Sequence, residues 1–339
     1  MQNNTPVLHT ENLTVGYPGD RESGGPVFSD INVDARSSEL VALFGPNGIG
    51  KSTLLRSLVK LLIPLSGKIY LYGSNIKNYP ANRIAKIAGF VSTETVRINN
   101  LRVYDLVSLG RYPHTGWMGR LNSHDIEKVE EALEMVGISE LKSKYINRLS
   151  DGERQRAMIA RTLAQDTPVI VLDEPTAYLD LPNKYEIIHL LHRLAAEKGK
   201  TVIFSTHDLG IAIQEASKIW VMLHGQIFQG APEDLILDGS FGRMFEHTNL
   251  LFSKGKGEFR IRREPGTIIG LYGPAPERRW TRNALERTGF GVAENKTCDT
   301  VVEVVNTDGN RSWIIKQGET NISFASIYEL CSYLKPSGA

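Results

Sequence analysis

The sequence predicts an α/β protein with a parallel core sheet, on three observations. Val169–Leu172 and Thr201–Phe204 are unbroken apolar or β-branched runs, as expected for strands buried on both faces of a parallel sheet. The stretch between them has the apolar spacing of a helix. Leu40–Phe44 is a third apolar run, and it ends at a glycine-rich turn that precedes another helical pattern. This strand–helix–strand order places ligand chemistry at the carboxyl edge of the sheet.

The helices of this framework are predicted from the periodicity of their apolar residues. The helix between the two buried strands should bury Ile187, Ile188, Leu190, Leu191 and Leu194. A helix at Lys51–Ile63 follows the glycine-rich turn and ends before Pro64, which cannot continue the hydrogen-bond ladder. Its apolar residues are Leu54, Leu55, Leu58, Leu61 and Leu62.

Further elements are predicted on either side of these. Val7–Val15 and Lys68–Tyr72 are predicted strands. Asp125–Val136 is a predicted helix with Ile126, Val129, Leu133 and Val136 on one face. Ser123 is its candidate N-cap and Gly137 its C-terminal stop. This helix is assigned to a helical insertion at about residues 95–165.

A change of composition near His247 predicts a domain boundary. Residues 1–247 hold the elements above, and residues 248–339 begin with the glycine- and lysine-rich stretch Ser253–Glu258. We therefore expect a small C-terminal α/β domain. It shows no nucleophile, metal set or cofactor motif, so dimer support or regulation is only a hypothesis for its role.

The C-terminal part carries its own signals. Val301–Val305 and Trp313–Lys316 flank a predicted hairpin turn, and Ser323–Leu334 is a predicted closing helix. Cys298 and Cys331 are the two cysteines of the chain, too few for a disulfide framework, and we interpret them as packing residues.

Charge and hydropathy narrow the class of protein. Lys and Arg number 39 against 38 Asp and Glu, so no global field would attract nucleic acid. The beginning of the sequence lacks a signal-peptide pattern, and no apolar run approaches the ~20 residues that cross a bilayer. The sequence predicts a soluble, cytosolic chain with no nucleic-acid partner.

The glycine-rich turn fits the pattern G-x-x-x-x-G-K-S between a strand and a helix. Its residues are Gly45, Pro46, Asn47, Gly48, Gly50, Lys51, Ser52 and Thr53. Backbone N–H groups and the start of the helix can cradle phosphates there. Lys51 is expected to reach the outer phosphates and Ser52 to bind Mg2+. The motif predicts ATP binding and hydrolysis; a plain turn with a surface lysine is the alternative.

Asp173 and Glu174 end the buried strand Val169–Leu172, where two adjacent carboxylates need a cation or a proton-transfer role. We expect Asp173 to hold Mg2+, usually through water. Glu174 is the candidate base for the attacking water, while Lys51 and the metal stabilise charge on the transferring phosphoryl group. A helix-capping role for the segment is the alternative.

Leu149–Arg156 reads Leu-Ser-Asp-Gly-Glu-Arg-Gln-Arg, and here the sequence resembles the ATP-binding cassette (ABC) ATPases, whose signature is usually Leu-Ser-Gly-Gly-Gln. Asp151 and Glu153 depart from that signature, while Ser150 and Gly152 remain. The resemblance, over about residues 7–247, implies a P-loop NTPase fold with a parallel core sheet, an antiparallel β subdomain and a helical subdomain. It also implies a homodimer in which this segment contacts the γ-phosphate held by the second subunit.

A structural role for the signature segment stays open. Ser150 and Glu153 also satisfy a capping box, which needs no nucleotide, although both roles can hold together. Asp151 adds negative charge near the expected phosphate, so its side chain should point away or be paired.

Other landmarks of the family follow in the expected order. They are Tyr17 as the adenine-stacking aromatic, Asp180, and His207 after the last core strand. Taken alone, Tyr17 would be a turn aromatic and His207 an ordinary histidine at a strand end. The glutamine that the family carries after Phe90-Val91 is absent, and Thr93 and Glu94 occupy that region.

Leu106–His114, followed by Gly119-Arg120, resembles the importer ATPases for iron–siderophore complexes, haem and vitamin B12. This resemblance implies a peripheral protein on the cytoplasmic side of the inner membrane. It would dock on permease subunits, which receive substrate from an external substrate-binding protein. Thr93–Trp117 is the expected permease-facing surface. The alternatives are a cytosolic ABC ATPase of DNA repair or translation, and a regulator that only binds ATP.

Overall fold

The computed structural model divides the chain into two compact units. One comprises Met1–Met244 with Phe252–Glu258, and the other Phe245–Leu251 with Phe259–Ala339. The structure describes residues 5–19, 24–92, 100–116, 118–223, 225–243, 249–253, 258–264, 266–294, 298–307 and 309–335. The predicted boundary at 247–248 lies outside these residues, as do Thr93, Glu94 and Trp117.

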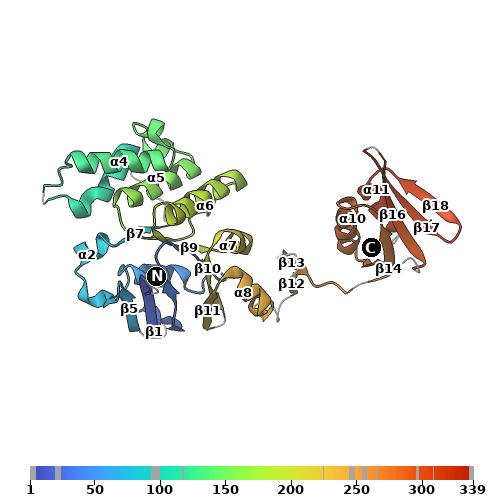
Figure 1. Ribbon diagram of the computed structural model, residues 1–339, viewed down its shortest axis with the longest axis horizontal. Coiled ribbons are helices and arrows are strands. Elements are labelled where there is room, and N and C mark those ends of the chain that lie inside the picture. The colour runs from blue at the N-terminus through green and yellow to red at the C-terminus, as the bar shows by residue number, and fades with distance from the viewer. Residues whose placement is uncertain are drawn as a thin grey trace. The chain divides into compact units, whose positions relative to one another are not determined.

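The first unit is built around a sheet of order β11-β10-β4-β9-β8-β7 (Figure 1). Its strands are parallel except β11, which pairs antiparallel with β10. Every residue of β4, β8 and β9 is buried, which explains why these strands lack an alternating pattern. The bounds are β4 Leu40–Phe44, β7 Ala88–Val91, β8 Val169–Leu172, β9 Thr201–Thr206, β10 Lys218–Leu223 and β11 Gln226–Gly230.

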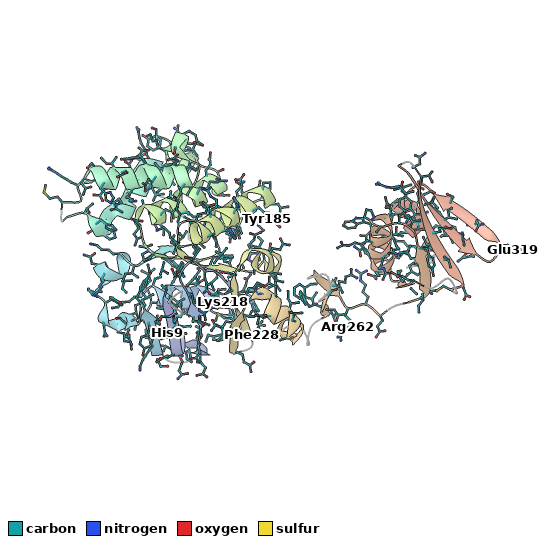
Figure 2. All side chains as sticks on the ribbon, in the orientation of Figure 1. His9, Tyr185, Lys218, Phe228, Arg262 and Glu319 are labelled. Carbon is teal, nitrogen blue, oxygen red and sulfur yellow. The ribbon has the colours of Figure 1, made fainter. Side chains whose placement is uncertain are left out.

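A second, antiparallel sheet in this unit has the order β2-β1-β5-β6, with β3 also paired to β1. Apolar residues from both sheets form one core cluster, which includes Leu13 and Ile31 of this sheet and Trp220 of β10. His9 on β1 and Lys218 on β10 mark the two sheets in Figure 2. The bounds are β1 Leu8–Tyr17, β2 Gly25–Ile31, β3 Asp34–Ala35, β5 Ser66–Leu71 and β6 Ser74–Asn75.

Helices connect the strands and form a separate group after β7. That group contains α3 Val103–Ser108, η2 Leu109–His114, α4 Ser123–Met135, η3 Ser139–Leu141, η4 Ile146–Arg148 and α5 Asp151–Ala164. The connecting helices are α1 Lys51–Leu58, η1 Ile76–Asn78, α2 Ala81–Ala85, α6 Leu181–Ala196, α7 Leu209–Glu215, α8 Pro232–Leu237 and α9 Ser240–Arg243. The predicted core stripe of α6 is buried throughout.

Two helices of this unit differ from their predictions. The helix expected at Lys51–Ile63 ends at Leu58, because Lys60 turns the backbone with φ 60°. Leu61 is consequently 64% exposed and does not belong to the helix core. The helix α4 begins at Ser123, so its N-cap is Asn122 and not Ser123, and Ile126 on its predicted apolar face is exposed.

The second unit contains a five-stranded sheet of order β15-β14-β16-β17-β18. Ala284 and Leu285 of α10 and Leu330 of α11 pack in its core, where Trp313 donates a 2.7 Å hydrogen bond to Thr281. Its bounds are β14 Ile268–Tyr272, α10 Glu277–Arg287, β15 Gly291–Ala293, β16 Thr300–Thr307, β17 Asn310–Gln317, β18 Thr320–Phe324 and α11 Ile327–Leu334.

The closing helix of this unit was predicted to begin at Ser323, which is wrong. Thr320–Phe324 pairs with β17 as an edge strand, and the helix begins only after Ser326, whose hydroxyl caps Glu329 N–H. The predicted hairpin around residues 307–310 is present as the antiparallel pair β16 and β17. A two-stranded sheet, β12 Leu250–Ser253 and β13 Glu258–Ile261, precedes β14.

No helix in the described part of the chain combines the length and the apolar character needed to span a bilayer.

Candidate active site

A pocket of about 560 Å³ opens at the carboxyl edge of the parallel sheet, between the glycine-rich turn and the end of β8. This volume is in the range of small-ligand sites. The predicted residues in its wall are Tyr17, Asn47, Gly48, Gly50, Lys51, Ser52, Thr53, Asp173 and Glu174. Val27, Ala177 and Tyr178 also line it and were not singled out from the sequence, where nothing marks them.

The turn before α1 has a backbone that only glycine adopts easily. Gly48 has φ 79° and Gly50 has φ 112°, and a Cβ on Gly50 would lie 2.7 Å from a methyl carbon of Val27. The helix α1 begins directly after this turn, at Lys51. The N–H groups of its first turn have no partner within the helix, so they can bind an anion.

Lys51 is folded back onto its own loop. Its ammonium group donates to the carbonyl oxygens of Gly45 at 2.8 Å and Pro46 at 3.2 Å. The same nitrogen lies 3.6 Å from Oε1 of Glu174, and the side chain is only 4% exposed. The loop therefore holds a buried positive charge against a carboxylate at the floor of the pocket.

Asp173 has one carboxylate oxygen satisfied and one free. Its Oδ1 accepts a 2.8 Å hydrogen bond from the Ser205 hydroxyl, and its Oδ2 is buried with no partner within the described residues. A buried carboxylate oxygen without a donor is costly unless a cation or water satisfies it. Sequence reasoning missed Ser205, although its position near the end of β9, the strand beside β8, was a usable signal.

Glu174 adopts a strained backbone conformation, with φ 44°, and its N–H donates a 2.8 Å hydrogen bond to Ser205 Oγ. This conformation turns the side chain toward Lys51 on one side and His207 on the other. His207 Nδ1 lies 3.8 Å from Glu174 Oε2, while the histidine is 55% exposed. His207 does not line the pocket itself, so the structure brings it to Glu174 rather than to the loop.

Ser150 and Glu153 form the capping box that the sequence allowed. Glu153 N–H donates to Ser150 Oγ at 3.2 Å, and Ser150 N–H donates to Glu153 Oε2 at 2.7 Å. That backbone hydrogen bond, together with Lys144 at 3.2 Å, holds the pKa of Glu153 below its usual value despite burial. Lys144 was not identified from the sequence because the pair depends on a tertiary contact.

The other signature residues are also paired or packed. Asp151 pairs with Arg154 at 2.7 Å, which agrees with the prediction that its side chain points away from the phosphate or is paired. A Cβ on Gly152 would lie 3.2 Å from Asn183, whose amide donates to Asp180 Oδ1 at 2.6 Å. Ser150, Gly152 and Asp180 are absent from the wall of the pocket, so the structure does not bring them to the glycine-rich turn of the same chain.

Comparison with known proteins agrees with this geometry. A family model described as "ABC transporter" matches residues 28–177, and one described as "Iron ABC transporter C-terminal domain" matches residues 265–335. An uncharacterised ABC transporter ATP-binding protein of Methanocaldococcus jannaschii is 36% identical over 260 residues, which cover 76% of this chain and 88% of that protein. The ferric enterobactin transport ATP-binding protein of Escherichia coli is 37% identical over 230 residues, covering 68% of this chain and 83% of that protein.

Solved structures give the same result. An inward-facing metal-chelate type ABC transporter matches with a TM-score of 0.62 and 28% identity, covering 76% of this chain and 96% of that one. A dimeric bacterial ABC transporter cassette matches with a TM-score of 0.59 and 27% identity, covering 66% of this chain and 98% of that one. The same kind of cassette has been solved in a post-hydrolysis state bound to ADP and phosphate.

The parallel sheet, the phosphate loop and the carboxylates at the end of β8 define a nucleotide-hydrolysing P-loop protein. The chain belongs to the family of ABC transporter ATP-binding proteins. It binds ATP and is an ATPase.

Proposed function

We propose that this chain energises an importer for iron–chelate substrates of the siderophore type. The observation that carries the proposal is its likeness to named import proteins. They include the ferric enterobactin protein above and an iron(3+)-hydroxamate import ATP-binding protein of Bacillus subtilis, 38% identical over 222 residues. The match of residues 265–335 to an iron transporter domain supports the same class. Haem and cobalamin complexes are the other substrates compatible with Leu106–His114.

Magnesium fits the donors at the end of β8. Asp173 offers a buried oxygen that lacks a partner within the described residues, and Ser52 offers a hydroxyl in the wall of the same pocket. Hard oxygen donors of this kind, together with substrate phosphates, are what Mg2+ prefers. When bound, Mg2+ would neutralise charge on the β- and γ-phosphates of ATP.

The protein residues then divide the chemistry of hydrolysis. Tyr17, 46% exposed at the pocket wall, stacks on the adenine ring. Glu174 accepts the proton of the water that attacks the γ-phosphorus, as the bond to the ADP oxygen breaks. Lys51 moves from its carbonyl partners to the phosphate oxygens, and His207, beside Glu174, contacts the γ-phosphate.

We further propose a homodimer. Ser150, Gly152 and Asp180 are not in the wall of their own chain's pocket, and the dimeric cassette that matches this chain supports a second subunit. Ser150 and Gly152 would approach the phosphate bound by the partner, where the start of α5 favours an anion. The negative charge of Asp151 would be unfavourable near that phosphate, and its ion pair with Arg154 offsets it.

A permease-docking surface is proposed on the helical group, on the described part of the segment predicted at Thr93–Trp117. Tyr112 is 76% exposed and Leu109 is 55% exposed on η2. A groove of about 400 Å³ is lined mostly by apolar side chains of α2, β7 and the turn after α1. Gln165 also lines it, and the carbonyl oxygen of Gln165 lies 2.9 Å from His114 Nε2 of this segment. Arg161 lies in it, its pKa lowered by burial, so the groove suits an apolar segment that also carries an acceptor group.

We propose on this basis that the protein acts at the cytoplasmic side of the inner membrane, bound to permease subunits that receive substrate from an external binding protein. Crosslinking tests the surface: a cysteine at Tyr112 should link to the permease in ATP-free complexes, and a cysteine at Tyr185 on α6, 44% exposed, should not. Links formed only from residues 259–335 would contradict the proposal.

Transport itself is tested in cells that lack this chain. Uptake of radiolabelled ferric siderophore should return with the wild-type chain and stay absent with Glu174→Gln. Normal iron uptake in the deletion strain would contradict the substrate class.

Removal of residues 248–339 tests dimer support or regulation by the C-terminal domain, since an unchanged ATPase rate and unchanged dimerisation would exclude both.

A further inference from the structure

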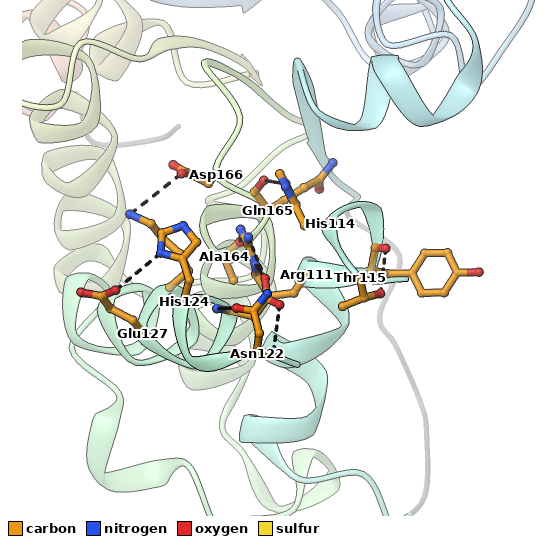
Figure 3. A network of polar contacts seen from close by, with 12 residues as sticks. Arg111, His114, Thr115, Asn122, His124, Glu127, Ala164, Gln165 and Asp166 are labelled. Carbon is orange, nitrogen blue, oxygen red and sulfur yellow. Dashed lines mark hydrogen bonds and ion pairs between the residues drawn. The ribbon is translucent and has the colours of Figure 1, made fainter. Parts of the chain in front are cut away.

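The 3₁₀ segment η2 is seated on the last turn of α5. Gly110 permits the approach, because a Cβ there would lie 2.0 Å from the carbonyl oxygen of Arg161. Arg111 then donates to the carbonyl oxygen of Ala164 at 2.8 Å, which satisfies one of the free carbonyl groups at the helix end (Figure 3). The segment that carries the exposed Tyr112 is therefore fixed to the C-terminal end of α5.

A buried ion pair joins the same segment to the start of α4. Nε and Nη2 of Arg111 each lie 2.9 Å from Oδ1 of Asp125, and the two side chains are 3% and 2% exposed. Oδ2 of Asp125 accepts a hydrogen bond from the N–H of Asn122, the N-cap residue of α4. Burial disfavours the carboxylate, but the hydrogen bonds from Asn122 and Arg111 outweigh it and hold the pKa of Asp125 below its usual value.

A second connection runs from η2 to α2 through Gln165, the C-cap residue of α5. His114 Nε2 lies 2.9 Å from the carbonyl oxygen of Gln165, so that nitrogen must carry the proton. The side-chain amide of Gln165 donates to the carbonyl oxygen of Ala85 in α2. The C-terminal end of α5 is thus held by η2, α4 and α2 together.

The other end of α5 carries the signature. The helix has 14 residues and begins after Ser150, so its two ends are about 21 Å apart at ~1.5 Å per residue. Its inner face is buried, from Ala157 to Ala164, so a change of tilt at one end displaces the other. The position of Ser150 and Gly152 therefore depends on how the Ala164 end is held.

We propose that Arg111 and Asp125 form a positioning pair, which sets the orientation of α5 so that Ser150 and Gly152 meet the nucleotide bound by the partner subunit. The inference rests on the dimer in the proposed function. Neither Arg111 nor Asp125 is in the wall of the nucleotide pocket, so the pair is not expected to touch the nucleotide held there. Loss of the pair should thus slow turnover without weakening nucleotide binding to the loop.

The test uses the full chain with Arg111→Gln, Asp125→Asn and the double substitution. Each single variant leaves one buried charge without its partner, and we expect kcat to fall on the order of tenfold or more, since small displacements of a catalytic group slow reactions strongly. Kd for a fluorescent ADP analogue should stay within about twofold of wild type. The double variant, a neutral hydrogen-bonding pair, should recover much of kcat.

Glu130→Gln is the matched control. Glu130 lies on α4, the helix of Asp125, and forms an exposed pair with Lys142, so the kcat of this variant should equal that of wild type. His114→Ala, which removes one hydrogen bond without leaving a buried charge, covers the case in which Arg111→Gln does not fold. It should give a smaller fall in kcat at unchanged Kd.

Three results would overturn the inference. The first is a wild-type kcat in folded Arg111→Gln and His114→Ala. The second is a loss of ADP affinity that parallels a loss of folded protein, because the pair would then contribute to stability alone. The third is a wild-type chain that hydrolyses ATP at full rate as a monomer. That result also removes the proposed dimer, whereas the first two leave it standing.

Discussion

The ammonium nitrogen of Lys51 lies 3.6 Å from Oε1 of Glu174, which joins the phosphate loop to the end of β8 across the floor of the pocket. Its other partners among the described residues are the carbonyl oxygens of its own loop, at Gly45 and Pro46. The triphosphate of ATP offers stronger, charged acceptors for the same ammonium group. Nucleotide binding should therefore draw Lys51 away from Glu174 and free the carboxylate for the attacking water.

Lys51→Ala should abolish tight nucleotide binding. The substitution removes the buried cation that compensates the phosphate charge, and we expect the Kd for ATP to rise on the order of tenfold or more. Isothermal titration calorimetry measures this change. Lys68→Ala is the control, because Lys68 is 58% exposed on β5, and a similar loss of affinity in both variants would contradict the role of Lys51.

Glu174→Gln should bind ATP and fail to cleave it. Glutamine keeps the size of the side chain but cannot accept the proton, so the rate of phosphate release should fall on the order of 10²-fold or more. ATP should then hold the variant in a long-lived dimer, which size-exclusion chromatography with light scattering detects. Rapid hydrolysis by this variant would transfer the role of base to another group.

Ser205→Ala should weaken the binding of Mg2+ while the affinity for nucleotide without metal is retained. The Ser205 hydroxyl donates to Asp173 Oδ1, which holds the carboxylate in an orientation that leaves Oδ2 without a partner in the described part of the chain. Losing a partner of this kind typically costs about 10–100-fold in metal affinity. The Mg2+ concentration that gives half-maximal ATPase rate should rise accordingly, and an unchanged value would show that Asp173 needs no such support.

Glu153→Gln should make the chain less stable at neutral pH and not at acidic pH. The pKa of Glu153 is lower in the folded state than the value of about 4.3 for a free glutamate. Its carboxylate therefore contributes stability that is fully present above that pH and is lost as the pH falls through the folded-state pKa. We expect a difference below about 1 kcal/mol at pH 7 in urea unfolding, because the pair with Lys144 is partly exposed.

The same urea series at about pH 3, below the pKa of a free glutamate, should show a smaller difference in stability between the two proteins. A difference between wild type and Glu153→Gln that persists at this pH would show that shape, rather than charge, decides at this position.

Elements with local sequence signals could be predicted without knowledge of the fold. The run Leu40–Phe44, the glycine turn with Lys51 and the buried strand before Asp173 lie where they were predicted, because short-range sterics and full burial leave few alternatives. Helix ends were predicted less accurately, because the αL turn at Lys60 and the cap at Asn122 depend on contacts within the fold.

Contacts between residues far apart in the sequence could not be predicted, because they depend on how the chain folds. Ser205 supports Asp173 from the neighbouring strand, Lys144 neutralises Glu153, and Arg111 reaches both Asp125 and the end of α5. These contacts join residues that lie apart in the sequence, so neither apolar periodicity nor a sequence motif predicts them. Burial gives them their strength, since a charge or carboxylate removed from water must find its partner within the fold.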